Sequence, residues 1–191
     1  MQDKLVSPTK AIAILKAGGI GVIPTDTVYG VVACAKDQKA VARLYTLKKR
    51  DHKPGSIVAA DAEQLIDLGL NKDHIQAVRH LWPNPLSLVI PTADELFYLH
   101  QGLDSLPARV PKDAQFQILL QQTGPLATSS ANRPGEPTAT NIQEAWNYFK
   151  DSIDFYVDAG DLSGREPSTI VRIANDNHTI EILRQGAFNF E

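Results

Sequence analysis

A polar, hydroxyl-rich turn joins two short apolar runs, residues 19–23 and 28–33. The turn, residues 24–30, reads PTDTVYG and offers two threonine hydroxyls, a carboxylate and a phenol. A plain connection between strands needs only Gly, Asn or Pro. This density indicates the wall of a ligand site, although Thr and Asp also make turn hydrogen bonds to their own backbone. Tyr29 fits a ligand wall and ordinary packing on a strand equally well.

A cationic loop follows, made of Lys48, Lys49, Arg50 and Lys53. Apolar residues at helical spacing within residues 39–47 place this loop at the end of a short amphipathic helix. Cations in a last turn also complement the helix dipole, which accounts for one or two of them. Lys53 comes after the helix should have ended, and such convergent cations are typical of a phosphate site. We expect Lys48 and Arg50 to be surface groups held for a ligand, with Lys49 pointing elsewhere.

A third polar segment, residues 126–140, carries five hydroxyl side chains, one Asn and a Pro-Gly turn. A strand that enters from Pro125 would leave Ser129, Ser130 and Asn132 at its tip, where ligands commonly bind in open α/β sheets. The alternative is a flexible linker. Linkers are not normally flanked by an apolar strand on one side and an amphipathic helix on the other, so we favour a ligand loop.

Strands and helices alternate along the chain and must position these polar segments. The periodicity predicts helices over residues 8–17, 38–48, 61–68, 72–81, 113–122 and 141–149. It predicts strands over residues 20–24, 28–34, 55–60, 85–91, 106–110, 126–129, 155–158, 168–173 and 179–184. Two of the connections run directly from strand to strand, which indicates a mixed rather than a purely parallel sheet.

Composition favours one compact domain over residues 1–191. The 191 residues are 43% hydrophobic and 21% charged, and a domain of this size buries roughly 70% of its unfolded surface. No apolar run has the length of a membrane span and the first residues lack a signal-peptide core, so we expect a soluble cytoplasmic protein. The lone Cys34 is expected in the core. The five histidines are scattered, which argues against a metal site made by the protein.

Several motifs, taken in order, resemble the YrdC family, the threonylcarbamoyl-AMP synthases. They are PTDTVYG at residues 24–30, the cationic loop ending in Lys53-Pro54, residues 81–89, Ala108-Arg109-Val110-Pro111, Ser130-Ala131-Asn132, Pro167-Ser168-Thr169-Ile170-Val171 and Leu183-Arg184-Gln185-Gly186. The likeness runs from about residue 8 to residue 187. Three departures from the family pattern are Asn84, Pro134 and Gln185.

The resemblance implies a twisted open α/β sheet flanked by helices, with one positively lined concave face and no C-terminal extension domain. It implies that L-threonine, bicarbonate and ATP react to give threonylcarbamoyl-adenylate and pyrophosphate. Other proteins would then transfer the threonylcarbamoyl group to adenosine 37 of certain tRNAs. Magnesium would arrive with ATP. The reaction needs positioning and charge neutralisation rather than a protein nucleophile.

Family positions assign roles to individual residues. The resemblance places the nucleotide phosphates at Lys48, Arg50 and Lys53, with Lys48 and Arg50 as the catalytic clamp. It places threonine at Thr27, Arg109, Ser130 and Ser168, where the guanidinium can grip a carboxylate in a two-bond fork. It also assigns contacts with ATP to Ser105, Asn132, Thr140 and Arg184. The alternative for Arg109 is a structural pairing with a neighbouring carboxylate.

Two other function classes are weaker. An RNA-binding module of the same fold conflicts with a net charge of −3, a pI near 5.9 and a single dense basic run, so we expect at most weak RNA binding. A magnesium-dependent sugar-phosphate enzyme, such as a dihydroxybutanone-phosphate synthase, would require a cluster of acidic ligands. Asp26 is the one carboxylate in the strongest motifs.

Overall fold

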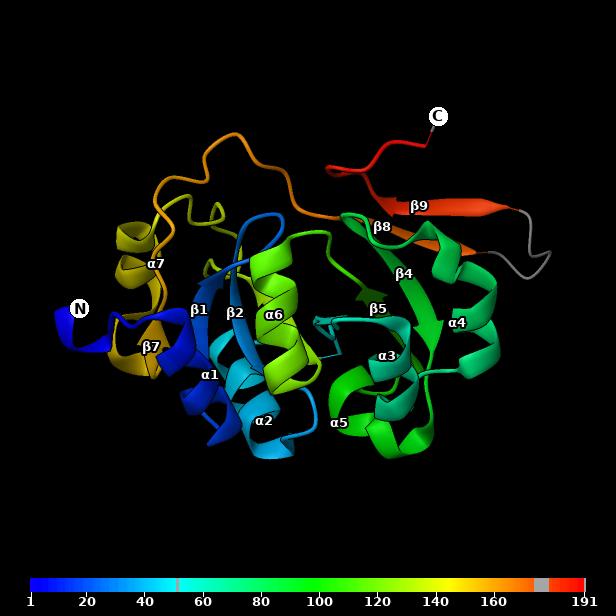
Figure 1. The fold of residues 1–191 in the computed structure, drawn as a ribbon, viewed down its shortest axis with the longest axis horizontal. Coiled ribbons are helices and arrows are strands. Elements are labelled where there is room, and N and C mark those ends of the chain that lie inside the picture. The colour runs from blue at the N-terminus through cyan, green and yellow to red at the C-terminus, as the bar shows by residue number, and fades with distance from the viewer. Residues whose placement is uncertain (51, 174–178, 191) are drawn as a thin grey trace.

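The computed structural model describes residues 1–50, 52–173 and 179–190. Within these residues, nine strands form one sheet in the order β7-β1-β2-β6-β3-β5-β4-β8-β9 (Figure 1). The strands are β1 (Gly21–Pro24), β2 (Tyr29–Cys34), β3 (Ser56–Val58), β4 (Leu86–Pro91), β5 (Ser105–Arg109), β6 (Leu126–Ser130), β7 (Phe155–Tyr156), β8 (Thr169–Ile173) and β9 (Ile180–Arg184).

The sheet is mixed, which confirms the prediction from the two direct connections. The pairs β1–β2 and β8–β9 are antiparallel neighbours in sequence. The pairs β2–β6, β3–β6 and β4–β5 are also antiparallel, whereas β1–β7, β3–β5 and β4–β8 are parallel.

Helices cover both faces of the sheet (Figure 1). They are α1 (Pro8–Lys16), α2 (Gln38–Leu47), α3 (Ala62–Leu68), α4 (Lys72–Val78), α5 (Phe97–His100), α6 (Ala114–Thr123) and α7 (Ile142–Phe149). Most begin at a residue whose side chain accepts a backbone N–H of the first turn, a strong start signal. These caps are Ser7, Asp37, Asp61, Asn71, Asp113 and Asn141.

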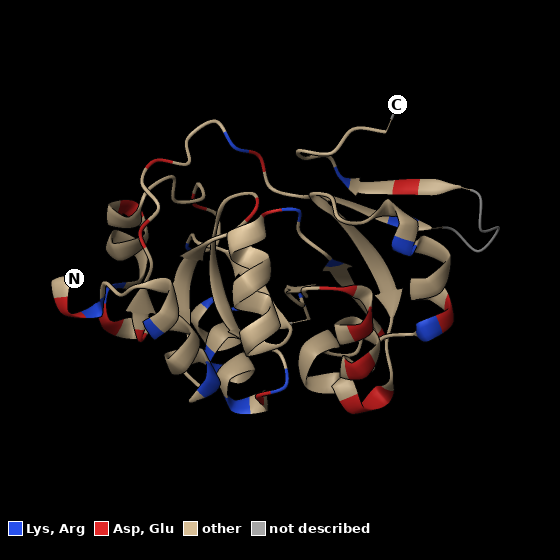
Figure 2. Cartoon of the chain, viewed as in Figure 1, with Lys and Arg blue, Asp and Glu red and all other residues tan. Residues whose placement is uncertain are grey.

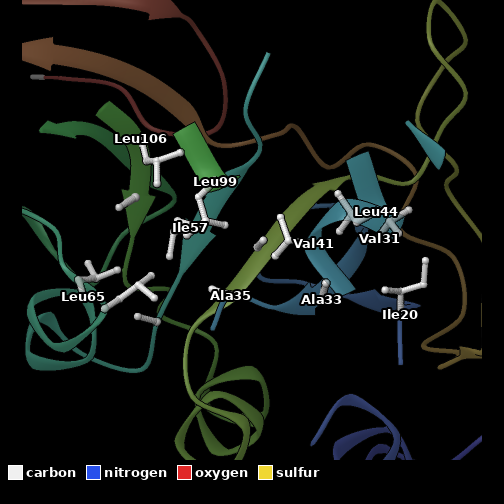
Figure 3. Packing of buried hydrophobic residues seen from close by; sticks show 14 of the residues in the cluster. Ile20, Val31, Ala33, Ala35, Val41, Leu44, Ile57, Leu65, Leu99 and Leu106 are labelled. Carbon is white, nitrogen blue, oxygen red and sulfur yellow. The ribbon is translucent and has the colours of Figure 1, made fainter. Parts of the chain in front are cut away.

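Two apolar clusters follow from the alternation of side chains across the strands. In β2, Val31 belongs to the larger cluster, whereas its neighbour Val32 belongs to the smaller one under α1 and α6. Figure 3 shows part of the larger cluster, in which Leu99 of α5 lies near Leu106 of β5 and Ile57 of β3, and Leu44 of α2 lies near Val31 of β2. Cys34 is half-buried on β2, and burial raises the pKa of its thiol to about 11.

The predicted elements agree with the structure except at short elements and ends. The predicted helix over residues 72–81 is α-helical to Val78 and continues as a 3-10 turn, Arg79–Leu81, because Pro83 disfavours helical geometry in the residue before it. Helix α5 was not predicted, since four residues are too few to show a periodicity. Strands β3 and β7 are shorter than predicted.

On the face of the sheet that α1 and α6 cover, the side chains change from apolar to polar along the strands. On β6, Leu126 lies in the apolar cluster, whereas Thr128 and Ser130 on the same face lie beyond it. The same change occurs between Val58 and Ser56 of β3. The strap, residues 157–168, leaves β7 near one edge of the sheet and crosses to β8 near the other edge (Figure 1).

Candidate functional site

A cavity of about 130 Å³ lies beyond the apolar cluster on this face. Its described lining combines hydroxyls, guanidinium groups and prolines: Thr25, Thr27, Val28, Tyr29, Gly30, Arg50, Pro54, Ser56, Pro107, Arg109, Thr128, Ser129, Ser130, Pro167, Ser168, Ile170 and Arg184. Pockets for drug-sized ligands are typically about 300–1,000 Å³. The cavity therefore suits one small substrate, and a nucleotide would extend beyond it.

The turn between β1 and β2 makes local hydrogen bonds and lines the cavity. The Thr25 hydroxyl donates to the Val28 carbonyl over 2.6 Å and accepts from the Thr27 N–H over 3.2 Å. The two threonine hydroxyls lie 3.1 Å apart. Both interpretations of this turn therefore hold, because its own bonds fix the Thr27 side chain at the cavity wall.

Tyr29 is fully buried at the start of β2 and also belongs to this wall. Its hydroxyl donates to the Gly160 carbonyl and accepts from the Ala159 N–H, each over 2.9 Å. Burial raises the pKa of Tyr29. The phenol thus anchors the strap beside the cavity.

Arg109 ends β5 and pairs with Asp26 of the turn. Its Nη2 lies 2.7 Å from Asp26 Oδ1, and its Nε lies 3.3 Å from each carboxylate oxygen. The Arg109 and Asp26 side chains are 4% and 5% exposed. Arg109 lines the cavity, but its fork already holds a carboxylate of the protein, which is the alternative stated for this residue. The sequence contains both residues, yet it does not reveal that β5 lies beside this turn.

Lys48 caps the C-terminal end of α2, and its ammonium group lies inside the protein. The residue is 6% exposed, so the prediction of a surface group is wrong for Lys48. Its Nζ donates to the Ser130 carbonyl over 2.7 Å, to the Asn132 side-chain oxygen over 2.8 Å and to the Asn132 carbonyl. Burial, and then the charge of Arg50, lower the pKa of Lys48 to about 8. Lys48 therefore ties the end of α2 to the loop after β6, while Lys49 is exposed.

Arg50 lines the cavity and also braces its own loop. Its Nη1 donates to the carbonyls of Lys53 and Pro54 over 2.8 and 2.6 Å, and its Nη2 donates to Ser129 Oγ over 3.0 Å. Burial lowers the pKa of Arg50. The Lys53 side chain is exposed and lies outside the cavity lining. Asp51 of this loop lies outside the described residues.

The loop after β6 presents Ser130 to the cavity. Ser130 Oγ donates to Asn132 Oδ1 over 2.7 Å, and Asn132 Nδ2 donates to the Glu136 carbonyl over 2.6 Å. Asn132 is half-buried and lies behind the lining, beside Lys48. The sequence indicates no role for Ser129 at this tip. In the structure its hydroxyl accepts the hydrogen bond from Arg50 Nη2.

The beginning of β8 and the end of β9 close the cavity on another side. Ser168 Oγ lies 3.0 Å from Ser87 Oγ of β4. Arg184 Nη2 donates to the Ser168 carbonyl over 2.6 Å, so the guanidinium is turned inward although the residue as a whole is exposed. Partial burial, and then the charges of Arg109 and Arg50, lower the pKa of Arg184. Three guanidinium groups therefore converge on one small space, which favours an anion.

Ser105 and Thr140, which are predicted to contact ATP, lie outside the cavity lining, as do Lys48, Lys53 and Asn132. Ser105 begins β5, on the same face as Pro107 and Arg109 but at the far end of the strand. Its hydroxyl donates to the Leu103 carbonyl over 3.1 Å. The Thr140 hydroxyl donates to Glu144 of α7 over 3.1 Å. The roles of Ser105 and Thr140 in ATP binding stay predictions.

Charges of both signs are spread over the described chain (Figure 2). Acidic residues gather in α3 and just before α5, whereas basic residues gather around α1 and α2. The positively lined concave face stays an expectation from the resemblance. Within the described residues, no group of three or more His, Cys, Asp or Glu side chains is arranged to hold a metal ion. No helix in the described ranges has the length and apolar character to cross a membrane.

Comparisons with known proteins show which family the chain resembles in sequence and fold. The profile of the Sua5/YciO/YrdC family, described as "Telomere recombination", matches residues 13–186. A Mycobacterium tuberculosis protein named as a candidate threonylcarbamoyl-AMP synthase is 34% identical over 186 residues, which cover 95% of this chain and 84% of the relative. The threonylcarbamoyl-AMP synthase of Pseudoalteromonas translucida is 32% identical over 167 residues, covering 84% of this chain and 89% of the relative.

A solved structure extends this similarity to three dimensions. Sua5 of P. abyssi, crystallised with L-threonine, superposes with a TM-score of 0.82 at 28% identity. The match covers 94% of this chain and 54% of the Sua5 chain, so the present chain spans about half the length of that protein.

Proposed function

Because the chain belongs to the Sua5/YciO/YrdC family, we propose that it is an L-threonylcarbamoyladenylate synthase, a nucleotidyltransferase. Its substrates are L-threonine, bicarbonate or CO₂, and MgATP, and its products are threonylcarbamoyl-AMP and pyrophosphate. The observation that carries the proposal is the match to named threonylcarbamoyl-AMP synthases over most of both chains. The product then serves downstream threonylcarbamoyl-transfer proteins that form N6-threonylcarbamoyladenosine at position 37 of tRNA.

The reaction joins two poorly reactive partners in two steps. The threonine amine attacks the carbon of CO₂, which forms when bicarbonate takes up a proton and loses water. The amine then releases a proton to give an N-carboxylate. An oxygen of that carboxylate then attacks the α-phosphorus, and the bond from the α-phosphorus to the β-phosphate oxygen breaks as pyrophosphate leaves. Well-oriented reactants are worth about 7–11 kcal/mol, so positioning and neutralisation of charge supply most of the acceleration.

Threonine binds in the small cavity in this proposal. Arg109 provides a cation for the substrate carboxylate, and Thr27, Ser130 and Ser168 provide hydroxyls that read the substrate side chain. All of these residues line the 130 Å³ space. A charge-assisted hydrogen bond in a partly dry pocket is stronger than the same bond in water, which favours this site for a single small carboxylate.

The nucleotide phosphates lie against Arg50 and Arg184 at the cavity and extend toward Lys53. Arg50 neutralises charge that develops as pyrophosphate leaves. Lys48 acts through the loop that it holds rather than by contact with phosphate, because its ammonium already donates to oxygens of that loop. Further contacts with ATP are made outside the cavity, by Asn132, Ser105 and Thr140.

Magnesium enters as part of MgATP. Asp26, between the lining residues Thr25 and Thr27, is engaged by Arg109. The metal ion is therefore coordinated by the ATP phosphates and water, as is usual for magnesium in nucleotide sites. A cytoplasmic location is part of the proposal and is checked by fractionation of cells.

A pyrophosphate-release assay tests the proposal. Purified protein with MgATP should release pyrophosphate when threonine and bicarbonate are both present, and omission of either should abolish the release. Release that needs neither substrate would contradict the proposal. Binding of tRNA without turnover would favour the RNA-binding module instead.

The Arg50→Ala variant tests the phosphate clamp in the same assay. We expect a loss of about 10²–10³-fold in turnover, typical of the removal of one group that stabilises a transition-state charge. The matched control is Lys49→Ala, an exposed cation one residue away, which should stay near the wild-type rate. Equal rates for Arg50→Ala and wild type would remove Arg50 from the site.

A further inference from the structure

A buried ion pair joins the first motif of the chain to the end of β5. The Nε and Nη2 atoms of Arg109 are both within 3.3 Å of Asp26 carboxylate oxygens. The side chains are 4% and 5% exposed, so little water competes for the paired atoms. Because a buried charge without its partner is strongly unfavourable, each group holds the other in place.

This pairing leaves one nitrogen of Arg109 uncommitted. In the described part of the chain, Nη1 has no hydrogen-bond partner, and it does not belong to the buried polar atoms that lack one. Nη1 is therefore accessible. Arg109 lines the cavity, whereas Asp26 does not.

The other two guanidinium groups at the cavity are held differently. Arg50 donates to two carbonyls and a hydroxyl, and Arg184 donates to the carbonyl and hydroxyl oxygens of Ser168. Among the described contacts of these three arginines, only Arg109 is held by a carboxylate. A long side chain released from such a partner would regain its rotamer freedom and move away from like charges nearby.

We propose that Asp26 is a positioning residue for threonine, which fixes Arg109 so that Nη1 donates to the substrate carboxylate. The inference deepens the proposed function and rests on it. It also replaces the expected two-bond fork to the substrate, because Nε and Nη2 are occupied by Asp26. The second donor to the threonine carboxylate must then come from another residue of the cavity wall.

Asp26→Asn is the direct test, since it removes the charge and keeps the shape. We expect the KM for threonine to rise tenfold or more, with the KM for ATP changed less than threefold. Asp26→Glu keeps the charge and should recover part of the threonine affinity. The matched control is Glu63→Gln, which breaks the exposed Glu63–Arg79 ion pair and should change neither constant.

A double-mutant cycle with Arg109→Lys shows whether Asp26 acts through Arg109. If it does, Asp26→Asn should weaken threonine binding in the wild-type background and add little in the Arg109→Lys background. Calorimetric titration of each variant with threonine and with ATP measures the two binding affinities. Additive losses would overturn the proposal, as would tighter threonine binding by Asp26→Asn, which would show that Asp26 competes with the substrate.

Folding and function are separated within the same experiment. Equal losses for threonine and ATP, or failure of both the Asn and Glu variants to fold, would assign Asp26 a structural role and overturn the proposal. Wild-type protein that binds threonine but forms no adenylate would contradict the proposed function and leave this inference standing. If the wild-type protein forms the adenylate and Asp26→Asn binds threonine with unchanged affinity, only this inference would be overturned.

Discussion

At the scale of single residues, Lys48 shows how burial changes the meaning of a basic motif. In sequence it belongs to a run of cations that suggests direct contact with phosphate. In the structure its ammonium donates inward to the loop of Ser130 and Asn132. The charge of Lys48 therefore acts on the shape of the cavity wall, while Arg50 presents its guanidinium to the cavity itself.

The lowered pKa of Lys48, about 8, predicts a pH dependence of ATP binding. The amine is charged below this pH and loses its charge as the pH rises through it, which weakens its hold on the loop. We expect ATP affinity to fall about threefold to tenfold between about pH 7.5 and pH 9.5, measured by calorimetry. Lys48→Arg stays protonated and should remove this fall, whereas Lys49→Arg should retain it. A flat profile for wild type would contradict the prediction.

The same shift has a consequence for folding stability. The folded-state pKa of Lys48 lies below its ordinary value of 10.5, so the unfolded chain binds more protons between about pH 8 and 10.5. The Lys48 contribution to the free energy of unfolding therefore rises with pH in this window. Below about pH 8 both states are protonated and this contribution is constant.

The hydroxyls at the cavity predict how the enzyme selects its amino acid. A pocket that hydrogen-bonds the substrate hydroxyl should reject valine by up to about 10⁴-fold in kcat/KM, because polar groups of the pocket would lose their partner. Serine should be a better substrate than valine. Equal turnover of valine and threonine would show that Thr27, Ser130 and Ser168 do not read the side chain.

At the scale of elements, the strap is the segment that joins distant parts of the sheet. It begins after β7, is anchored by Tyr29 and delivers Pro167 and Ser168 to the cavity. The chain just after β9 packs closely on this segment, since a Cβ on Gly186 would lie 2.1 Å from the Pro167 carbonyl oxygen. The strap therefore depends on contacts with β2 and β9 for its position.

Tyr29→Phe tests the anchor of the strap. The change leaves the Ala159 N–H and the Gly160 carbonyl without their partner, at a cost of about 1–3 kcal/mol. For a domain of this size the melting temperature should fall by about 2–4 °C for each kcal/mol. Tyr148→Phe removes an exposed hydroxyl bond to Pro137 and should have little effect. Equal melting temperatures for Tyr29→Phe and wild type would contradict the role of the anchor.

Elements with many apolar residues at a clear period could be predicted from the sequence, and contacts between distant elements could not. Helix α2 and strand β2 have strong periodic patterns, so their ends agree with prediction to within one residue. The pairing of Asp26 with Arg109 depends on the strand order, which places β3 between β5 and β6. The inward turn of Lys48 depends on the loop after β6, and no local pattern in residues 48–53 indicates it.

At the scale of the whole molecule, one continuous sheet connects both ends of the structure. The larger apolar cluster includes Ile20 beside β1 at one end and Ile90 of β4 toward the other. The residues that line the cavity come from several strands of this sheet, among them β2, β5, β6 and the edge strand β9. The prediction of a single domain therefore implies a single cooperative unfolding transition.

The two tryptophans test this cooperativity. Trp82 precedes β4, whereas Trp146 of α7 packs beside Tyr156 of β7. Urea unfolding of the single-tryptophan variants Trp82→Phe and Trp146→Phe, followed by fluorescence, should give one transition in each. Far-UV circular dichroism of each variant should have the same midpoint as its fluorescence. Separated midpoints for the two probes within one variant would indicate two folding units.

Direct detection of the adenylate is the measurement that tests the central claim. The protein is incubated briefly with MgATP, threonine and ¹³C-bicarbonate. The products are then separated, and their masses are measured by mass spectrometry. The account predicts threonylcarbamoyl-AMP that carries one ¹³C atom and is absent when threonine is omitted. Its amount should fall about 10²–10³-fold when Arg50 is replaced by Ala. Pyrophosphate release without a threonine-containing adenylate, or an adenylate without the bicarbonate carbon, would contradict it.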